Sequence, residues 1–225
     1  MKNKKGFTLT EILLAVMIVG LIAISLASLT RAAARESGVG RSRIMLRNNL
    51  SRFMRTLRTD IMTASRVDEC ALCGAAGDRD SFVIEDGEIV LLLRLTKNAT
   101  KNNEAISDKN GAPVSVMYCF EKGTDTTNIM PEDATRGGKI YRYDHSVNDT
   151  PECKDVIEDA EVILTHVKYI PSTSESGYKV PLIGRRNYSR ENMNSMLRAN
   201  IITELNSTPI VNETVEETFM VPVGY

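Results

Sequence analysis

Residues 4–11 read Lys-Lys-Gly-Phe-Thr-Leu-Thr-Glu, and an apolar run of eighteen residues, Ile12 to Leu29, follows them directly. As a helix, Phe7 to Leu29 would measure about 34 Å, enough to cross a bilayer core of about 30 Å. Glu11 stands at the start of this apolar segment. An acidic residue costs roughly 2.5–3.5 kcal/mol at the centre of a membrane helix, and less near an end. A carboxylate in this place therefore indicates a functional site with a partner.

This N-terminal pattern resembles the prepilin leader of type IV pilins and type II secretion pseudopilins. Its parts are a short basic leader, Gly6 followed by Phe7, and Glu11 four residues later, ahead of the apolar run. In that family a prepilin peptidase cuts after the glycine and methylates the new N-terminal phenylalanine. The resemblance implies cleavage between Gly6 and Phe7, N-methylation of Phe7, and a role for Glu11 as the assembly carboxylate. Thr10 departs from the pattern, because the family usually has an apolar residue there.

An ordinary secretory signal peptide is the competing interpretation. Such peptides have an apolar core of roughly 7–15 residues and a cleavage site of the Ala-x-Ala kind. Ala32-Ala33-Ala34 offers that site, but Arg31 beside it and Glu11 within the apolar core both argue against cleavage there. An uncleaved membrane anchor also stays open.

The charge of the chain does not indicate a nucleic-acid-binding protein. The formal net charge is −1, and removal of Lys2, Lys4 and Lys5 with the leader would make it −4. Aromatic residues make up 5% and tryptophan is absent, which is little for a site that stacks sugars or bases. Positive charge is nevertheless concentrated after the apolar run, where nine arginines stand against only Glu36 and Asp60: Arg31, Arg35, Arg41, Arg43, Arg47, Arg52, Arg55, Arg58 and Arg66. A solvated helix face is the favoured explanation, with anionic lipid or DNA as alternatives.

Residues 30–67 have the pattern of an amphipathic helix that continues the apolar one. Apolar side chains recur there at steps of three and four, which places them on one face. They are Leu46, Leu50, Phe53 or Met54, Leu57, Ile61 and Ala64. The stretch from Leu46 to Ile61 is similar to the second half of the N-terminal helix in J-type minor pseudopilins and W-type minor pilins.

The remainder of the chain is predicted to be rich in β-strands. Glu85-Asp86-Gly87 is a turn signal between two apolar segments and predicts a hairpin. The expected strands are 81–84, 88–95, 114–120, 139–143, 161–170, 178–183, 197–205 and 210–221. The segments 121–136 and 144–159 are polar and are predicted to be loops with few apolar anchors.

Four cysteines lie beyond the apolar run: Cys70, Cys73, Cys119 and Cys153. If the domain is exported, an even number of cysteines in an oxidising compartment predicts two disulfides. Our hypothesis pairs Cys119 with Cys153 and Cys70 with Cys73. Free thiols and a zinc site built on Cys70 and Cys73 remain alternatives.

No catalytic residue, metal site or cofactor is predicted. The chain contains neither a Gly-x-Ser-x-Gly nucleophile motif nor a glycine-rich loop with phosphate-binding spacing. His166 falls in an alternating segment and is interpreted as a residue on the surface of a sheet. Acidic residues gather between 144 and 159 without the spacing of an EF-hand, so a solvated loop is favoured over a calcium site.

A long helix followed by strands predicts an α+β fold, and the resemblance implies that this fold is pilin-like. The expected organisation is a leader at 1–6, a transmembrane or filament-core helix at 7–29, an amphipathic helix at 30–67 and a β-rich globular domain at 68–225. The resemblance implies a structural subunit and not an enzyme: a minor pseudopilin of a type II secretion pseudopilus, or a subunit of a type IV pilus-like filament. Its implied partners are other pilin subunits, the prepilin peptidase, the membrane and an inner-membrane assembly platform, whereas nucleic acid is not expected.

The implied location is the bacterial inner membrane, crossed once, with the C-terminal domain periplasmic or extracellular. The alternative from another class is a membrane-anchored extracytoplasmic enzyme or ligand-binding domain with a leader that only mimics a prepilin.

Overall fold

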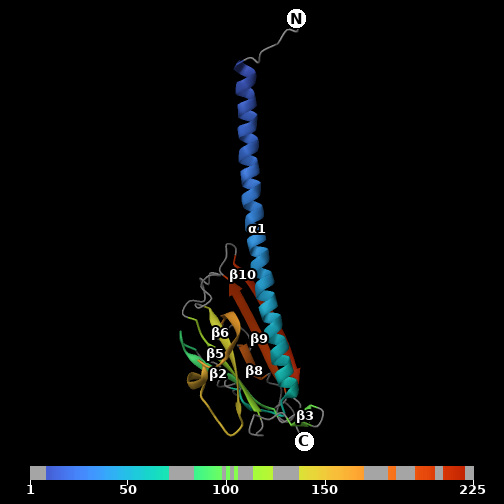
Figure 1. The fold of residues 1–225 in the computed structure, drawn as a ribbon, viewed down its shortest axis with the longest axis vertical. Helices are drawn as coiled ribbons and strands as arrows, with labels where there is room; N and C mark the ends of the chain where they lie inside the picture. Colours follow the sequence, from blue (N-terminus) through green and yellow to red (C-terminus); the bar gives the residue numbers. More distant parts are fainter. Residues whose placement is uncertain are drawn as a thin grey trace. The chain divides into compact units, whose positions relative to one another are not determined.

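The computed structural model describes residues 9–70, 84–97, 100–101, 104–105, 114–123, 137–169, 182–185, 196–205 and 210–220. Two compact units divide the chain, Met1–Arg41 and Ser42–Tyr225. The long helix α1, Leu9–Thr63, contributes residues to both units (Figure 1).

The first unit contains the apolar part of α1. Its large apolar side chains are between 48% and 78% exposed, at Ile18 and Leu9 respectively. The hydroxyl groups within this part are satisfied by the helix itself: Ser25 Oγ, for example, donates to the Leu21 carbonyl oxygen at 2.9 Å. The helix contains a window with a mean hydropathy of 2.8, so its length and composition suit a membrane span.

In the second unit, α1 from Ser42 onwards buries a stripe of side chains spaced three and four residues apart, as the sequence predicts. The buried residues are Leu46, Leu50, Phe53, Met54, Leu57, Asp60 and Ile61. The helix ends at Thr63, four residues before the predicted end at Val67. The reason is a partner distant in sequence: the Ser65 amide donates to the Thr96 carbonyl oxygen at 2.8 Å, and the chain then enters strand β1, Arg66–Glu69.

An antiparallel sheet of eight strands forms the rest of the second unit, counted over the described residues. The strand order is β1-β2-β5-β6-β7-β9-β10, and β8 pairs with β9. The bounds are β1 Arg66–Glu69, β2 Ile89–Lys97, β5 Val114–Glu121, β6 Gly138–Ser146, β7 Glu161–Lys168, β8 Leu182–Arg185, β9 Met196–Leu205 and β10 Val211–Met220. A separate pair is formed by β3 Thr100–Lys101 and β4 Glu104–Ala105.

This long N-terminal helix followed by an antiparallel sheet is the α+β, pilin-like architecture that the sequence predicts. The turn at Glu85-Asp86-Gly87 is also confirmed, because the Glu88 amide donates to the Glu85 carbonyl oxygen at 3.1 Å. Gly87 has a φ of +76°, a conformation that side chains with a Cβ rarely adopt. The expected hairpin partner at residues 81–83 lies outside the described residues.

Alternation along the strands gives the sheet two apolar faces. Tyr118 and Phe120 of β5 point to the face that α1 covers and belong to the main core with Phe53 and Leu57. Cys119, between them, belongs to a smaller cluster on the opposite face. A register shift between Leu91 and Leu93 changes which residues of β2 point to each face. Further along β2, Lys97 is consequently on the α1 side.

Candidate functional site

The N-terminal candidates fall at the beginning of α1. Glu11 lies in the first turn of the helix and is exposed. A carboxylate in that turn interacts favourably with the positive end of the helix dipole, typically by about 0.3–1 kcal/mol. Gly6 and Phe7, the expected cleavage and methylation residues, lie outside the described residues. Their roles and that of Glu11 therefore remain predictions from the sequence.

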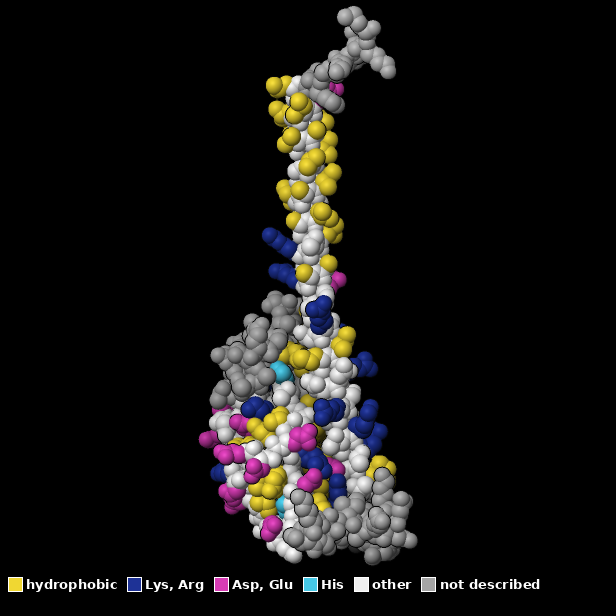
Figure 2. Space-filling model, in the orientation of Figure 1, with side chains coloured by type: hydrophobic (Ala, Val, Ile, Leu, Met, Phe, Trp, Pro, Cys, Tyr) yellow, Lys and Arg dark blue, Asp and Glu magenta, His cyan; other side chains and the backbone are white. Residues whose placement is uncertain are grey.

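Beyond Glu11, α1 exposes large apolar side chains along the whole stretch from Ile12 to Leu29, and many of them are visible on the face shown in Figure 2. Such a surface would be unfavourable in water, because monomeric soluble proteins rarely expose contiguous apolar patches of more than a few hundred Å². The helix needs either lipid or other apolar helices around it. The first unit is therefore a candidate site for membrane insertion and for helix–helix association.

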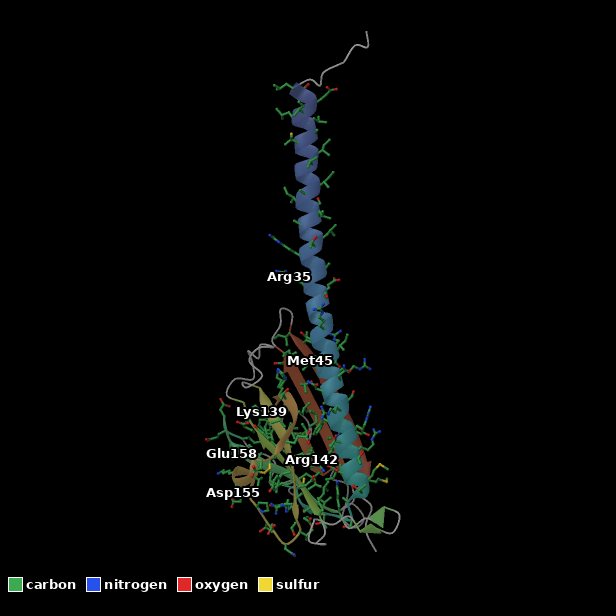
Figure 3. The ribbon with its side chains drawn as sticks, in the orientation of Figure 1. Arg35, Met45, Lys139, Arg142, Asp155 and Glu158 are labelled. Atoms are coloured by element: carbon green, nitrogen blue, oxygen red, sulfur yellow. A yellow bond between two sulfur atoms is a disulfide. The ribbon has the colours of Figure 1, made fainter. Side chains whose placement is uncertain are left out.

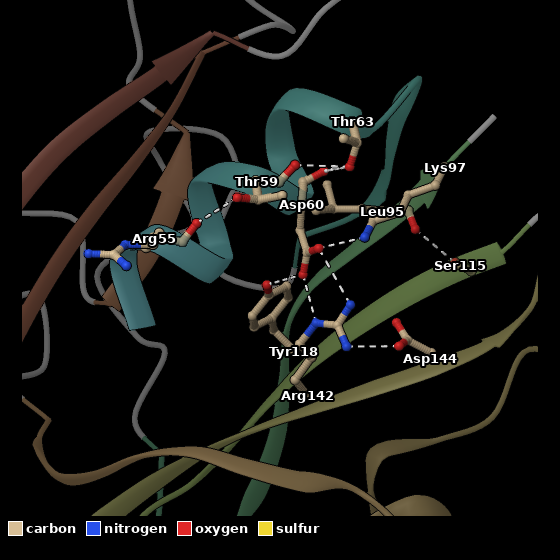
Figure 4. Close-up of polar contacts among 10 residues, drawn as sticks. All are labelled: Arg55, Thr59, Asp60, Thr63, Leu95, Lys97, Ser115, Tyr118, Arg142 and Asp144. Carbon is tan, nitrogen blue, oxygen red and sulfur yellow. Dashed lines mark hydrogen bonds and ion pairs between the residues drawn. The ribbon is translucent and has the colours of Figure 1, made fainter. Parts of the chain in front are cut away.

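A buried carboxylate near the C-terminal end of α1 joins the helix to the sheet. Asp60 Oδ1 accepts from Lys97 Nζ at 2.5 Å, and Asp60 Oδ2 accepts from the Tyr118 hydroxyl at 2.5 Å and from Arg142 Nε at 2.7 Å. Arg142 Nη1 also donates to Asp144 Oδ2 at 2.8 Å (Figure 4). Three strands, β2, β5 and β6, thus converge on one helical side chain. We call Asp60, Lys97, Tyr118 and Arg142 the Asp60 cluster.

The Asp60 cluster is buried, and its two positive charges are balanced by Asp60 together with the neighbouring Asp144. The Asp60 side chain is 5% exposed, Lys97 11% and Arg142 18%. Burial alone would raise the pKa of Asp60, but its hydrogen bonds from Arg142, Lys97 and Tyr118 outweigh that effect and lower the pKa below 3.8. Burial and the neighbouring Asp60 charge raise the pKa of Tyr118 well above 10, so its hydroxyl stays a donor.

This cluster fixes the rotation and position of the helix on the sheet, because a carboxylate with several buried donors tolerates little displacement. No partner for Asp60 is predicted from the sequence, where this residue stands among the arginines and within the stretch from Leu46 to Ile61. One signal could have identified it: Asp60 follows Leu57 by three residues and precedes Ala64 by four, which places it on the apolar stripe. A charged side chain on a buried face needs buried partners of opposite charge.

Three arginines of the arginine-rich segment form ion pairs with strands of the sheet at the flanks of the helix. Arg43 Nε lies 3.4 Å from Glu213 Oε1 of β10, and Arg58 also pairs with Glu217 of that strand. On the other flank, an Arg52 nitrogen lies 3.7 Å from Glu161 Oε1 of β7. The predicted solvated face is therefore in part an intramolecular contact. Exposed pairs of this kind each contribute about 0–1 kcal/mol.

The cysteines attach a short helix to the face of the sheet opposite α1. Cys119 and Cys153 are joined by a disulfide, the pairing that we predicted, across 34 residues of sequence. Cys153 begins α2, Cys153–Val156, and both of its end residues are buried against Met117 and Tyr141. The expectation of a polar loop with few anchors at 144–159 is therefore wrong, because these apolar side chains cover the second face.

The second predicted disulfide is described only in part. Cys70 is disulfide-bonded, whereas Cys73 lies outside the described residues, so the pairing of these two stays a prediction. Within the described part of the chain, no three His, Cys, Asp or Glu side chains are grouped closely enough to hold a metal ion.

His166 is not on the surface of the sheet, as the sequence suggested, but is 4% exposed. Strand β7 has an irregular register there, since Val167 lies opposite Gly138 but Leu164 opposite Ile140. The extra residue gives His166 a φ of 61°, and its Nε2 has no hydrogen-bond partner among the described atoms. Burial lowers the pKa of His166 below 6.5.

At Gly138, a Cβ would lie 2.7 Å from the Phe120 ring, so the strands approach closely only because this residue is glycine.

Comparison with known proteins identifies the N-terminal segment. Residues 1–27 match the family model described as the prokaryotic N-terminal methylation motif. No curated protein and no solved structure matches the chain. The matched segment contains the predicted leader, Glu11 and most of the apolar run, and it does not include the sheet. The motif and the fold are similar to those of type IV pilin-like proteins, and the apolar helix fits a membrane anchor.

Proposed function

We propose that this chain is a structural subunit of a type II secretion pseudopilus or a type IV pilus-like filament. A J-type minor pseudopilin is our first choice, and a minor type IV or competence pilin is the second. The observation that carries the proposal is the exposed apolar part of α1, most of which lies within the match to the methylation motif. Prepilin peptidase would cut between Gly6 and Phe7 and methylate Phe7.

In this proposal the mechanism is non-covalent polymerisation. The apolar part of α1 leaves the inner membrane at the assembly platform and packs with the corresponding helices of other subunits. Glu11 pairs there with the N-terminal amine of Phe7 on a neighbour. Either charge alone is costly to bury in a medium of low dielectric constant, whereas a close pair is tolerable. The pair would set the register between subunits as well as contribute affinity.

The Asp60 cluster gives the sheet a part in this mechanism. When α1 moves from the membrane into a filament, the exported domain has to follow the helix. Three strands hold Asp60, and the flanking pairs at Arg43, Arg52 and Arg58 add contacts along the helix. The C-terminal half of α1 therefore serves as the attachment of the domain, and the apolar half is left for assembly.

Replacement of Glu11 by leucine tests the proposal. Glu11→Leu makes the helix more apolar, so we expect membrane insertion to be unchanged or improved. Incorporation into filaments should fall, because the ammonium of the neighbouring subunit loses its partner. Glu11→Gln should be intermediate, since it keeps an acceptor and loses the charge. The measurements are co-purification with partner pilins and a blot of the membrane fraction.

Glu36 supplies a matched control for this experiment. It is an exposed carboxylate of the same helix that lies beyond the apolar run. Glu36→Leu makes the same chemical change and should leave assembly intact. Assembly of Glu11→Leu at the wild-type level would refute the mechanism, even if the leader were still cleaved.

A further inference from the structure

Two arginines follow the apolar part of α1 at the depth where lipid headgroups would lie. Arg31 and Arg35 come two and six residues after Leu29, the last residue of the apolar run. At 1.5 Å per residue, these positions are about 3 Å and about 9 Å further along the helix. A bilayer with a hydrocarbon core of about 30 Å has headgroup regions that bring the total to about 40–45 Å, or roughly 5–7 Å on each side.

The helix is continuous through this point, so both side chains have a defined place on it. α1 runs without interruption from Leu9 to Thr63, and residues 31–35 are exposed. Arg35 is labelled in Figure 3, on α1 beyond its apolar part. Arginine side chains are long enough to adjust their depth by several ångströms while the helix stays in place. Both guanidinium groups can therefore reach phosphate groups at the membrane surface.

Arg31 and Arg35 form a like-charged pair at positions i and i+4. Such a pair destabilises a helix by about 0.2–0.5 kcal/mol when nothing compensates it. Within the described residues, neither guanidinium lies within ion-pair distance of a carboxylate, in contrast to Arg43, Arg52 and Arg58. Ala32, Ala33 and Ala34 separate the two arginines, so small side chains leave room for an anion beside them.

The distribution of charge along the sequence also needs an explanation. Lys2, Lys4 and Lys5 precede the apolar run, and Arg31 and Arg35 follow it. Positive charge close to both ends of a membrane helix weakens the signal that sets its orientation. Binding of a ligand therefore explains the arginines after the apolar run better than a role in setting the orientation of the helix in the membrane. Guanidinium groups bind phosphate oxygens in a two-point geometry, which makes phosphate the anion of choice.

We propose that Arg31 and Arg35 bind the headgroups of anionic phospholipids in the leaflet next to Leu29. This contact would hold α1 at a fixed depth in the membrane before assembly and would be given up when the subunit leaves the bilayer. The inference rests on α1 spanning a membrane. It depends neither on cleavage after Gly6 nor on the role of Glu11, so it can fail while the proposed function holds.

The experiment uses the full chain in a zwitterionic detergent, titrated with phosphatidylglycerol or with phosphatidylcholine. Native mass spectrometry counts the bound lipids and gives an apparent affinity for each. We expect the wild-type chain to prefer phosphatidylglycerol. Arg31→Gln/Arg35→Gln should weaken phosphatidylglycerol binding by about fivefold for each arginine removed and should leave phosphatidylcholine binding unchanged. Glutamine is a good helix former, so α1 should remain intact.

Arg47→Gln/Arg55→Gln is the matched control. Both residues are exposed arginines of α1 in the second unit, and the double change removes the same total charge. This control should bind phosphatidylglycerol as the wild type does. The proposal is overturned if Arg31→Gln/Arg35→Gln keeps the wild-type preference. It is equally overturned if the control loses as much affinity, because net charge would then explain the effect.

Discussion

Replacing Asp60 by asparagine should destabilise the β-rich unit by about 3 kcal/mol. The change removes one buried negative charge and leaves Lys97 and Arg142 facing an amide of similar shape. Breaking a buried ion pair from one side typically costs about 3–5 kcal/mol, because the remaining charge is left without compensation. Lys97 and Arg142 are 11% and 18% exposed, so limited contact with water favours the lower end of that range.

For a domain of this size, a loss of about 3 kcal/mol corresponds to a decrease of roughly 6–12 °C in Tm. The measurement is a thermal unfolding curve of the full chain in detergent at pH 7, followed by circular dichroism at the β-sheet wavelength. Near-neutral pH keeps Asp60 ionised in the wild type, since its partners lower its pKa below 3.8. The full effect of the substitution is therefore expected under these conditions.

Asp144→Asn is the matched control, because Asp144 pairs with the same arginine at 2.8 Å but is 50% exposed. Exposed pairs contribute about 0–1 kcal/mol, so the control should unfold close to the wild-type temperature. If Asp60→Asn and Asp144→Asn unfolded at the same temperature, the reasoning about the Asp60 cluster would be wrong. The charge of Asp60 would then have no special role in attaching the helix.

Three further predictions concern other parts of the chain. Replacing Cys119 and Cys153 by serine should lower the free energy of unfolding by about 4 kcal/mol, because in the chain-entropy model the disulfide closes a loop of 34 residues. Denaturant titration measures this loss, and an unchanged midpoint would contradict the prediction. The unfolded chain protonates His166 first as the pH falls below 6.5, so stability should decrease from there towards the lower folded-state pKa. His166→Asn, which tolerates a positive φ, should reduce that decrease between pH 7 and pH 5, and an identical slope would count against it. Gly6→Leu should block leader cleavage more strongly than Gly6→Ala, because the residue before the cut must fit the peptidase; a mobility shift on gels reports cleavage, and equal processing of both variants would argue against the assigned site.

The features predictable from the sequence are those set by local patterns. The apolar run from Ile12 to Leu29 required a helix of membrane length, and the spacing of Leu46, Leu50 and Leu57 gave the face that packs on the sheet. Asp86-Gly87 marked a turn because the backbone at Gly87 has a positive φ. Each of these signals lies within a few residues of the structure it specifies.

The features that could not be predicted depend on partners distant in sequence. Asp60 is held by Lys97, Tyr118 and Arg142, which are 37, 58 and 82 residues away. Their convergence follows from the strand order and from the register shift in β2, and neither is encoded by a local pattern. The early end of α1 also depends on a distant partner, since the Thr96 carbonyl oxygen accepts a hydrogen bond from the Ser65 amide.

The second face of the sheet was missed for a different reason. The sequence between 144 and 159 is mostly polar, so its few apolar residues carried little weight. Cys153 and Val156 nevertheless reach the sheet because the disulfide to Cys119 holds α2 against it. His166 was assigned to the surface because a regular alternation places it there, and the irregular register of β7 reverses that assignment.

The mass of the mature protein, measured on intact chain extracted from membranes, distinguishes prepilin processing from cleavage of an ordinary signal peptide. We expect a product of 219 residues that begins at Phe7 and carries one N-terminal methyl group, because the proposed cleavage after Gly6 removes residues 1–6. A soluble product of 191 residues beginning at Arg35 would contradict it. That result would show that Ala32-Ala33-Ala34 is the cleavage site of an ordinary signal peptide, and the apolar helix would then be absent from the mature protein.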